Sequence, residues 1–247
     1  MPRYKAIIEY YGPAYSGFQI QPTSHTVAAA ILQALQKFSQ QQVELNFAGR
    51  TDAGVHAKGQ IIDFFLHKKY PLYKITEGLN FYLKEAKEEV AIQKTQLVPD
   101  DFNSRYHAIE KTYEYHMLNR KTPSPLYKNR AWQVKYNLHI QQMQEGANYL
   151  LGTHDFTSFR SADCQAKSPV RTIDNIIITR RQQLIKIKIT GKSFLYNQVR
   201  IIAGTLVEVG RGRIDSKKIK SILQAKSRDR AGQTAPAYGL YLTEVKY

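Results

Sequence analysis

A strand–loop–strand at residues 43–66 constrains the fold of this chain more than any other feature. Two short apolar runs, 43–47 and 61–66, are rich in β-branched and aromatic residues and have the composition of strands. The segment between them shows no helical period and contains Gly49, Gly54 and Gly59. It also carries an arginine (Arg50), a carboxylate (Asp52) and an imidazole (His56), so we expect a polar loop between paired strands.

The rest of the chain alternates strand-like runs with amphipathic stretches. The patterns predict helices at 26–39, 71–83, 139–151, 194–209 and 216–225. They predict further strands at 4–10, 89–93, 111–118, 131–135, 173–179, 184–190 and 239–247. This order favours an α+β protein with a mostly antiparallel sheet flanked by helices. The repeated order predicts two similar halves, residues 1–105 with the polar loop and residues 106–247.

The chain carries a large excess of positive charge. It has 36 Lys and Arg against 20 Asp and Glu, a formal net charge of +16. A basic surface attracts polyanions, so RNA, DNA or an anionic membrane are the expected partners. The basic clusters are dispersed, which suits a folded groove along a phosphate backbone better than a polybasic membrane anchor. They lie at 67–69, 120–121, 128–130, 180–181, 211–213, 217–220 and 226–230.

Hydropathy and cysteine content point to a cytoplasmic protein. No apolar run approaches the ~20 residues that span a bilayer, so we expect no membrane partner. The first residues lack the apolar core of a signal peptide. The one cysteine, Cys164, forms no intramolecular disulfide framework, fits a reducing compartment and argues against a cysteine-based zinc site.

The polar loop matches a known signature almost letter for letter. Residues 48–56, Ala-Gly-Arg-Thr-Asp-Ala-Gly-Val-His, resemble the signature of the tRNA pseudouridine synthase A family. Nine consecutive residues of mixed chemistry are far more specific than a lone glycine pattern. Other segments resemble the family in its own order and extend the resemblance over essentially the full length. They are 15–21, 98–105, 111–115, 151–160, 194–204 and 239–242.

Some positions depart from the family's pattern. Phe18 stands in place of a tryptophan and Tyr11 in place of an aspartate. Residues 27–30 replace a more polar helix start, and residues 80–84 replace a segment usually closer to Asn-x-x-Leu-Pro. These differences bear on RNA docking and on helix surfaces, and they leave the expected chemistry unchanged.

The resemblance implies the pseudouridine synthase fold and a cofactor-free isomerase. Such an enzyme converts uridine to pseudouridine at positions 38, 39 and 40 in the anticodon stem-loop of tRNA. It works as a homodimer with one tRNA lying across both subunits. By the same resemblance, the C-terminal half completes the active-site cleft.

The reaction breaks the N1–C1′ bond, turns the base and joins C5 to C1′, so one carboxylate suffices and no redox group is needed. We assign the carboxylate to Asp52. Three roles fit it, namely attack at C1′, attack at C6 and removal of the 2′ proton, and the residues do not choose among them. Burial opposes ionisation of a carboxyl group, and the resemblance assigns its buried partner to Arg200.

The resemblance also assigns the groups that contact the substrate. Tyr113 matches the active-site tyrosine that stacks on the target base and is a candidate for the base that removes the C5 proton, although a core tyrosine on a strand is the commoner case. The target uridine must leave its stack, and Arg50 is placed to fill the space or hold the phosphate, unless it forms a structural salt bridge. Leu240 packs over the active site in the family, although an ordinary strand leucine is the default.

Two other functions remain open from the residues. The charge of +16 and the 17 tyrosines suit a non-catalytic RNA-binding or RNA-folding module. A metal-dependent nuclease would use Asp52, His56 and Asp63, but Gly54 breaks helical i, i+4 geometry and no third ligand is adjacent. We therefore expect no metal site, and expect His56 to form hydrogen bonds within the loop.

Overall fold

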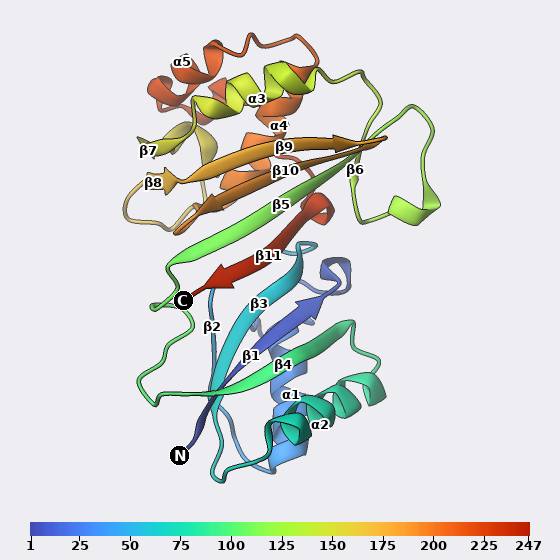
Figure 1. The fold of residues 1–247 in the computed structure, drawn as a ribbon, viewed down its shortest axis with the longest axis vertical. Helices are drawn as coiled ribbons and strands as arrows, with labels where there is room; N and C mark the ends of the chain where they lie inside the picture. The colour runs from blue at the N-terminus through green and yellow to red at the C-terminus, as the bar shows by residue number, and fades with distance from the viewer. The chain divides into compact units, whose positions relative to one another are not determined.

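The computed structural model describes residues 1–247 and divides into two compact units. The first unit consists of residues 1–109 and 242–247, and the second of residues 110–241. Each unit has a sheet and its own helices (Figure 1). No helix is both long and apolar enough to cross a bilayer. The fold is α+β with mostly antiparallel sheets flanked by helices, as the sequence predicts.

The first unit is built on an antiparallel sheet. Its strands are β1 (Arg3–Tyr10), β2 (Leu45–Phe47), β3 (His56–Phe65), β4 (Val90–Val98) and the C-terminal part of β11 (Leu240–Lys246). The order is β4-β1-β3-β11, with β2 paired to β3. β1 is antiparallel to both β3 and β4. Along β1, alternate residues are fully buried, namely Tyr4, Ala6 and Ile8, as expected for a strand with one face in the core.

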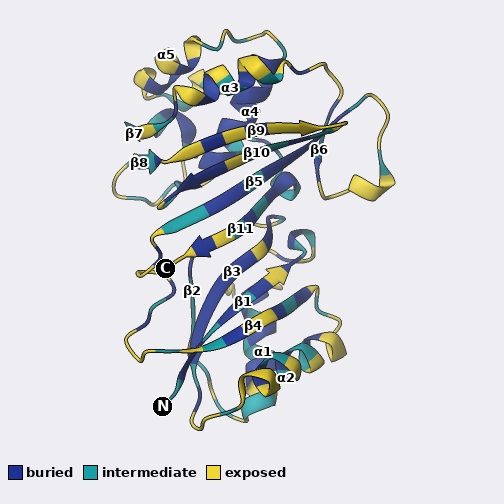
Figure 2. Ribbon diagram, in the orientation of Figure 1, coloured by how far each residue is buried: buried dark blue, intermediate teal, exposed yellow.

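Two helices complete this unit. They are α1 (Val27–Ser39), whose first turn is capped by the side chain of Thr26, and α2 (Leu72–Glu85). The helices pack so closely that a Cβ on Gly78 would lie 2.5 Å from the Phe38 ring. In Figure 2 the dark, buried residues concentrate on β3 and on one side of the helices.

A side-chain amide closes the outer edge of the first sheet. Asn80 of α2 donates from Nδ2 to the carbonyl of Ile92 at 2.8 Å and accepts its N–H at Oδ1, also at 2.8 Å. This exchange of both bonds with one residue is what an antiparallel neighbour strand would make. The edge strand β4 is therefore partly blocked against pairing with another chain.

The second unit has a sheet of the order β5-β10-β9. These strands, β5 (Glu110–Asn119), β9 (Asn175–Arg181) and β10 (Leu184–Gly191), are antiparallel, and β6 (Trp132–Val134) runs parallel to β5. The predicted alternation in β10 is confirmed, because Ile185, Ile187 and Ile189 are fully buried. The residues between them point to the opposite face of the strand, where Lys186 is half-buried and Lys188 is exposed.

Helices and a small sheet surround this framework. They are α3 (Ile140–Asn148), α4 (Gln198–Gly210), α5 (Lys218–Ala225), β7 (Gly152–Asp155) and β8 (Val170–Ile173). Gln144 of α3 closes the edge strand β9. It donates to the carbonyl of Ile176 at 2.9 Å and accepts the N–H of Ile178 at 2.8 Å. The amide bonds to residues 176 and 178 but not to the residue between them, which is the pattern that a parallel neighbour strand would make.

Three predicted boundaries are wrong in informative ways. The strand predicted at 61–66 begins earlier, at His56, because the backbone is already extended before the apolar run starts. The helix predicted from 194 begins at Gln198, since Asn197 has a left-handed φ of 61° that no α-helix accommodates. The strand predicted at 173–179 is divided between β8 and β9 at Asp174.

Candidate active site

Asp52 lies in a tight turn between β2 and β3. The Val55 N–H donates to the Asp52 carbonyl at 3.1 Å, and Gly54 has a φ of 81°. A four-residue turn with a positive φ at its third residue strongly favours glycine at that place. Asp52 is half-buried, and its neighbour Thr51 is buried. The glycine that the sequence places in the loop therefore turns the chain directly after the carboxylate.

The strand β1 and the residues after it hold this turn. The Tyr10 hydroxyl shares a hydrogen bond with Thr51 Oγ1 at 2.7 Å, and Phe18 N–H donates to the Thr51 carbonyl at 3.1 Å. The backbones also approach closely. A Cβ on Gly12 would lie 2.3 Å from the carbonyl carbon and oxygen of Val55. The turn is thus fixed by contacts on both sides of Asp52.

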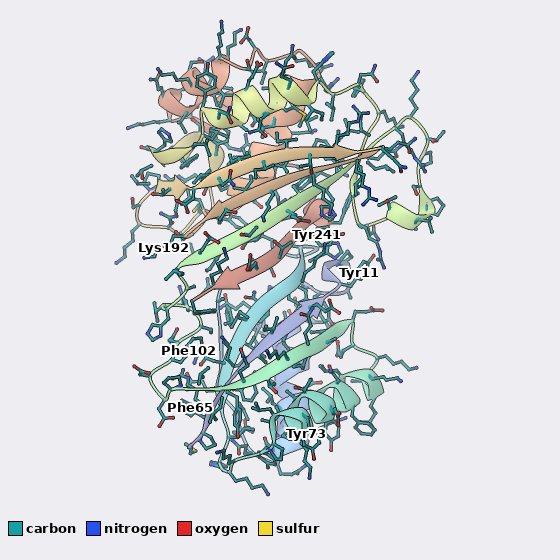
Figure 3. The ribbon with its side chains drawn as sticks, viewed as in Figure 1. Tyr11, Phe65, Tyr73, Phe102, Lys192 and Tyr241 are labelled. Carbon is teal, nitrogen blue, oxygen red and sulfur yellow. The ribbon has the colours of Figure 1, made fainter.

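His56 joins the same support. Its Nδ1 accepts the Gly12 N–H at 3.2 Å, so Nδ1 carries no proton, and the ring is buried. Tyr11, labelled in Figure 3, packs its ring 5.2 Å from the imidazole. We expected His56 to form hydrogen bonds within the loop, but this bond connects the ring to Gly12, which follows β1 and lies outside the loop.

The three residues of the nuclease hypothesis do not form a metal cluster. The structure contains no group of three His, Cys, Asp or Glu side chains placed to hold an ion. Asp63 is fully buried and accepts bonds from Arg3, Asn46 and the Ser104 N–H, the last at 2.7 Å. Its carboxylate is therefore part of a structural ion pair within the first unit.

Arg50 shares the loop with Asp52 and lies on the surface. The backbone beside it is anchored, since the Gly49 carbonyl accepts a bond from Gln60 Nε2 at 2.7 Å. Gln60 itself is fully buried. An exposed guanidinium on an anchored backbone is available to a polyanionic partner.

The remaining predicted site residues belong to the second unit. Tyr113 lies on β5, is 9% exposed, and meets the ring of Phe194 edge-on at 5.3 Å. Leu240, the first residue of β11, is buried. Tyr115 is fully buried with its hydroxyl donating to the Pro236 carbonyl at 2.8 Å. Burial raises the pKa of the Tyr115 phenol well above its ordinary value, so this tyrosine stays neutral.

Arg200 lies in the first turn of α4 and is half-buried. Its Nε donates to the Ala235 carbonyl at 2.7 Å, and its Nη1 donates to Asn197 Oδ1 at 2.6 Å. The apolar neighbours Ile201 and Ile202 are fully buried, but Arg200, expected to be a buried partner, is itself only half-buried. Sequence reasoning missed Asn197 and the Ala235 carbonyl as partners of the guanidinium. An asparagine near the start of the predicted helix was the available signal, because asparagine tolerates left-handed backbone.

Comparison with known proteins identifies the family. The sequence model described as tRNA pseudouridine synthase matches residues 6–107 and 147–247. The tRNA pseudouridine synthase A of Bartonella quintana (strain Toulouse) is 44% identical over 247 residues, all of both chains. That of Bartonella tribocorum (strain CIP 105476 / IBS 506) gives the same values. That of Brucella ovis (strain ATCC 25840 / 63/290 / NCTC 10512) is 43% identical over 100% of this chain and 98% of its own.

This chain belongs to the tRNA pseudouridine synthase family, as its loop signature indicates. The family consists of isomerases that convert uridine to pseudouridine in tRNA, so the chain is an enzyme of that class. Among solved structures, one in the crystal structure of a Cbf5-Nop10-Gar1 complex is similar with a TM-score of 0.38 and 12% identity. It covers 97% of this chain and 48% of that chain, and the assignment does not depend on it.

Proposed function

We propose that this enzyme converts uridine to pseudouridine at positions 38, 39 and 40 in the anticodon stem-loop of tRNA, without a cofactor. Asp52 is the catalytic carboxylate in this proposal. The observation that carries it is the half-buried turn at Asp52, held by Tyr10 of β1 and by Gly12 just after it, within the segment that matches the family.

The chemistry asks for one well-placed carboxylate. The N1–C1′ bond breaks, the uracil turns, the C5–C1′ bond forms, and C5 loses its proton to a base. Substrate and product have the same atoms, so no oxidant or acyl donor enters the balance. A carboxylate whose position is set before the substrate arrives lowers the barrier by avoiding reorganisation during the reaction. The supports of the Asp52 turn serve this purpose.

The other predicted residues take substrate-binding roles. The target uridine must be turned out of the stem-loop before it reacts. Exposed Arg50 either binds a phosphate or fills the space that the uridine leaves, and Tyr113 stacks on the base. Arg200 supplies positive charge close to the reaction, and Leu240 packs against the nucleotide. The enzyme acts on tRNA in the cytoplasm as a homodimer, and the net charge of +16 supports a polyanionic partner.

The test is pseudouridine mapping in an unmodified tRNA transcript. The transcript is incubated in EDTA with the wild type, with Asp52→Asn, and with Asp101→Asn. Asp101 is an exposed aspartate of the same unit and serves as the matched control. We expect new pseudouridine at positions 38 to 40 with the wild type and the control. Asp52→Asn should form none, while its tRNA affinity stays within about 3-fold because no phosphate contact is lost.

Each other outcome has a definite meaning. Pseudouridine formed by Asp52→Asn at the wild-type rate would remove Asp52 from the chemistry. Pseudouridine at other tRNA positions would retain the carboxylate and overturn the choice of substrate. Absence of product from the wild type, with tRNA binding intact, would favour a non-catalytic RNA-binding module.

A further inference from the structure

The residue before α4 has an unusual backbone conformation. Asn197 adopts φ 61° and ψ 4°, in the left-handed region, and α4 begins at the next residue. Its carbonyl still accepts the first helical bond, from Ile201 N–H at 2.9 Å. Most helices place an N-terminal cap in extended backbone. The side chain of Asn197 makes no capping bond, so it has another role.

That side chain links two other residues. Asn197 Oδ1 accepts a bond from Arg200 Nη1 at 2.6 Å, and its Nδ2 donates to Ser161 Oγ at 2.7 Å. Ser161 is itself tied to the same stretch, since its N–H donates to the Tyr196 carbonyl at 3.2 Å. The arginine bond fixes the orientation of the amide, because the guanidinium can only donate. A chain of hydrogen bonds thus runs from Ser161 through Asn197 to Arg200.

A second contact holds the guanidinium from the other side. Ala235 accepts from Arg200 Nε, and its own N–H donates to the Arg200 carbonyl at 3.2 Å. The segment that carries Ala235 lies directly on α4. A Cβ on Gly204 would lie 1.8 Å from the Gln233 carbonyl oxygen, so only glycine permits this approach. The Gly232 N–H donates to Thr205 Oγ1 at 2.9 Å and secures the same segment.

We propose that Asn197 is a positioning residue that sets the direction of the Arg200 guanidinium for catalysis, with Ser161 as its anchor. This inference rests on the proposed function, in which Arg200 supplies positive charge to the reaction. Two bonds on different nitrogens define the plane of a guanidinium. A long side chain that is already oriented loses less freedom when the substrate binds.

Asparagine combines the properties that this position needs. It tolerates the left-handed backbone, offers an acceptor to the arginine and offers a donor to the serine. Glycine would keep the backbone and lose both bonds. Aspartate would keep the acceptor and place a negative charge beside Arg200. The conservative and the truncating substitutions therefore separate position from charge.

The first experiment measures single-turnover pseudouridine formation and tRNA affinity for Asn197→Gly. Its matched control is Gln182→Gly, because Gln182 also has a positive φ, of 55°, and lies exposed in the same unit. We expect the rate of Asn197→Gly to fall about 10- to 100-fold, as for a misplaced catalytic group. Its tRNA affinity should change less than about 3-fold, and the control should keep the wild-type rate. Ser161→Ala should show a smaller loss of the same kind.

A double-mutant cycle tests whether Asn197 acts through Arg200. In the Arg200→Ala background, Asn197→Gly should lower the rate by less than about 2-fold, since the group that it positions is gone. An equal loss in both backgrounds would overturn the inference. A wild-type rate for Asn197→Gly with a large loss for Arg200→Ala would also overturn it and leave the proposed function intact. A wild-type rate for Arg200→Ala would instead remove Arg200 from the proposed function.

An NMR measurement tests the positioning role if the double mutant is too slow to assay or Asn197→Gly does not fold. The Nε–H resonance of Arg200, assigned by its disappearance in Arg200→Lys, should be single and sharp in the wild type. Ser161→Ala and Asn197→Asp should shift it, and Ser161→Ala should broaden it. An unchanged Arg200 resonance in both folded variants would contradict the positioning role.

Discussion

The two units hold their proposed functional residues in different ways. In the first unit Asp52 lies in a turn that is supported largely through backbone, with Gly12 packed against Val55 and Phe18 bonded to the Thr51 carbonyl. In the second unit Arg200 extends from a helix and is directed by the side chain of Asn197 and the carbonyl of Ala235. Asp52 carries its carboxylate on a short side chain, whereas Arg200 carries its guanidinium on a long one.

This difference predicts how each part fails. A short side chain is placed by its own backbone, so added atoms that push the backbone should misplace Asp52. A long side chain reaches its position through rotatable bonds, so removal of its partners should misplace Arg200. The first unit should be sensitive to insertion of a methyl group and tolerant of a lost hydroxyl. The second should lose activity when a single amide is removed.

Gly12→Ala should have the largest effect on the first unit. The new methyl group would meet the backbone of Val55 at 2.3 Å, and backbone cannot rotate away as a side chain can. We expect a loss of about 1–3 kcal/mol in the free energy of unfolding and a fall in kcat of about 100-fold from the displaced turn. Denaturant unfolding and single-turnover assays measure the two quantities.

Gly212→Asn is the matched control for this glycine. Gly212 also has a positive φ, of 72°, but a Cβ there would meet nothing within 4 Å. Asparagine tolerates this conformation, so stability and kcat should both stay near those of the wild type. A kcat for Gly12→Ala equal to that of the control would show that backbone packing does not place Asp52.

His56→Ala should have the next largest effect. It removes the acceptor of the Gly12 N–H and leaves that buried donor unpaired, at about 1–3 kcal/mol of folding stability. Activity should fall about 10-fold as the turn loosens. His56→Asn places an amide oxygen near the position of Nδ1 and should recover much of both losses. If His56→Asn is as damaged as His56→Ala, the imidazole has a role other than accepting this bond.

The sequence predicted the fold class and most elements because these follow from local periodicity. The Asp52 turn was predictable from Gly54 and the flanking apolar runs. The partners of that turn were not, since Tyr10 and Thr51 are 41 residues apart and no local pattern links them. The start of α4 was mispredicted because the predicted helix extends through Asn197, whose left-handed backbone no local pattern shows. Long-range polar contacts such as the Tyr10–Thr51 bond depend on the assembled fold.

Tyr10→Phe should have the smallest effect and gives the sharpest test of the comparison. It deletes one hydroxyl from a buried pair and keeps the ring, at about 0.5–1.5 kcal/mol of folding stability. The Phe18 bond to Thr51 and the Gly12 contact remain, so kcat should change less than about 3-fold. Measured beside Asn197→Gly, the variant compares the loss of one polar group in each unit. An equal loss of kcat in the two variants would show that Asp52, like Arg200, is placed by side-chain bonds. A small loss in Tyr10→Phe alone would leave backbone packing as the element that holds the carboxylate.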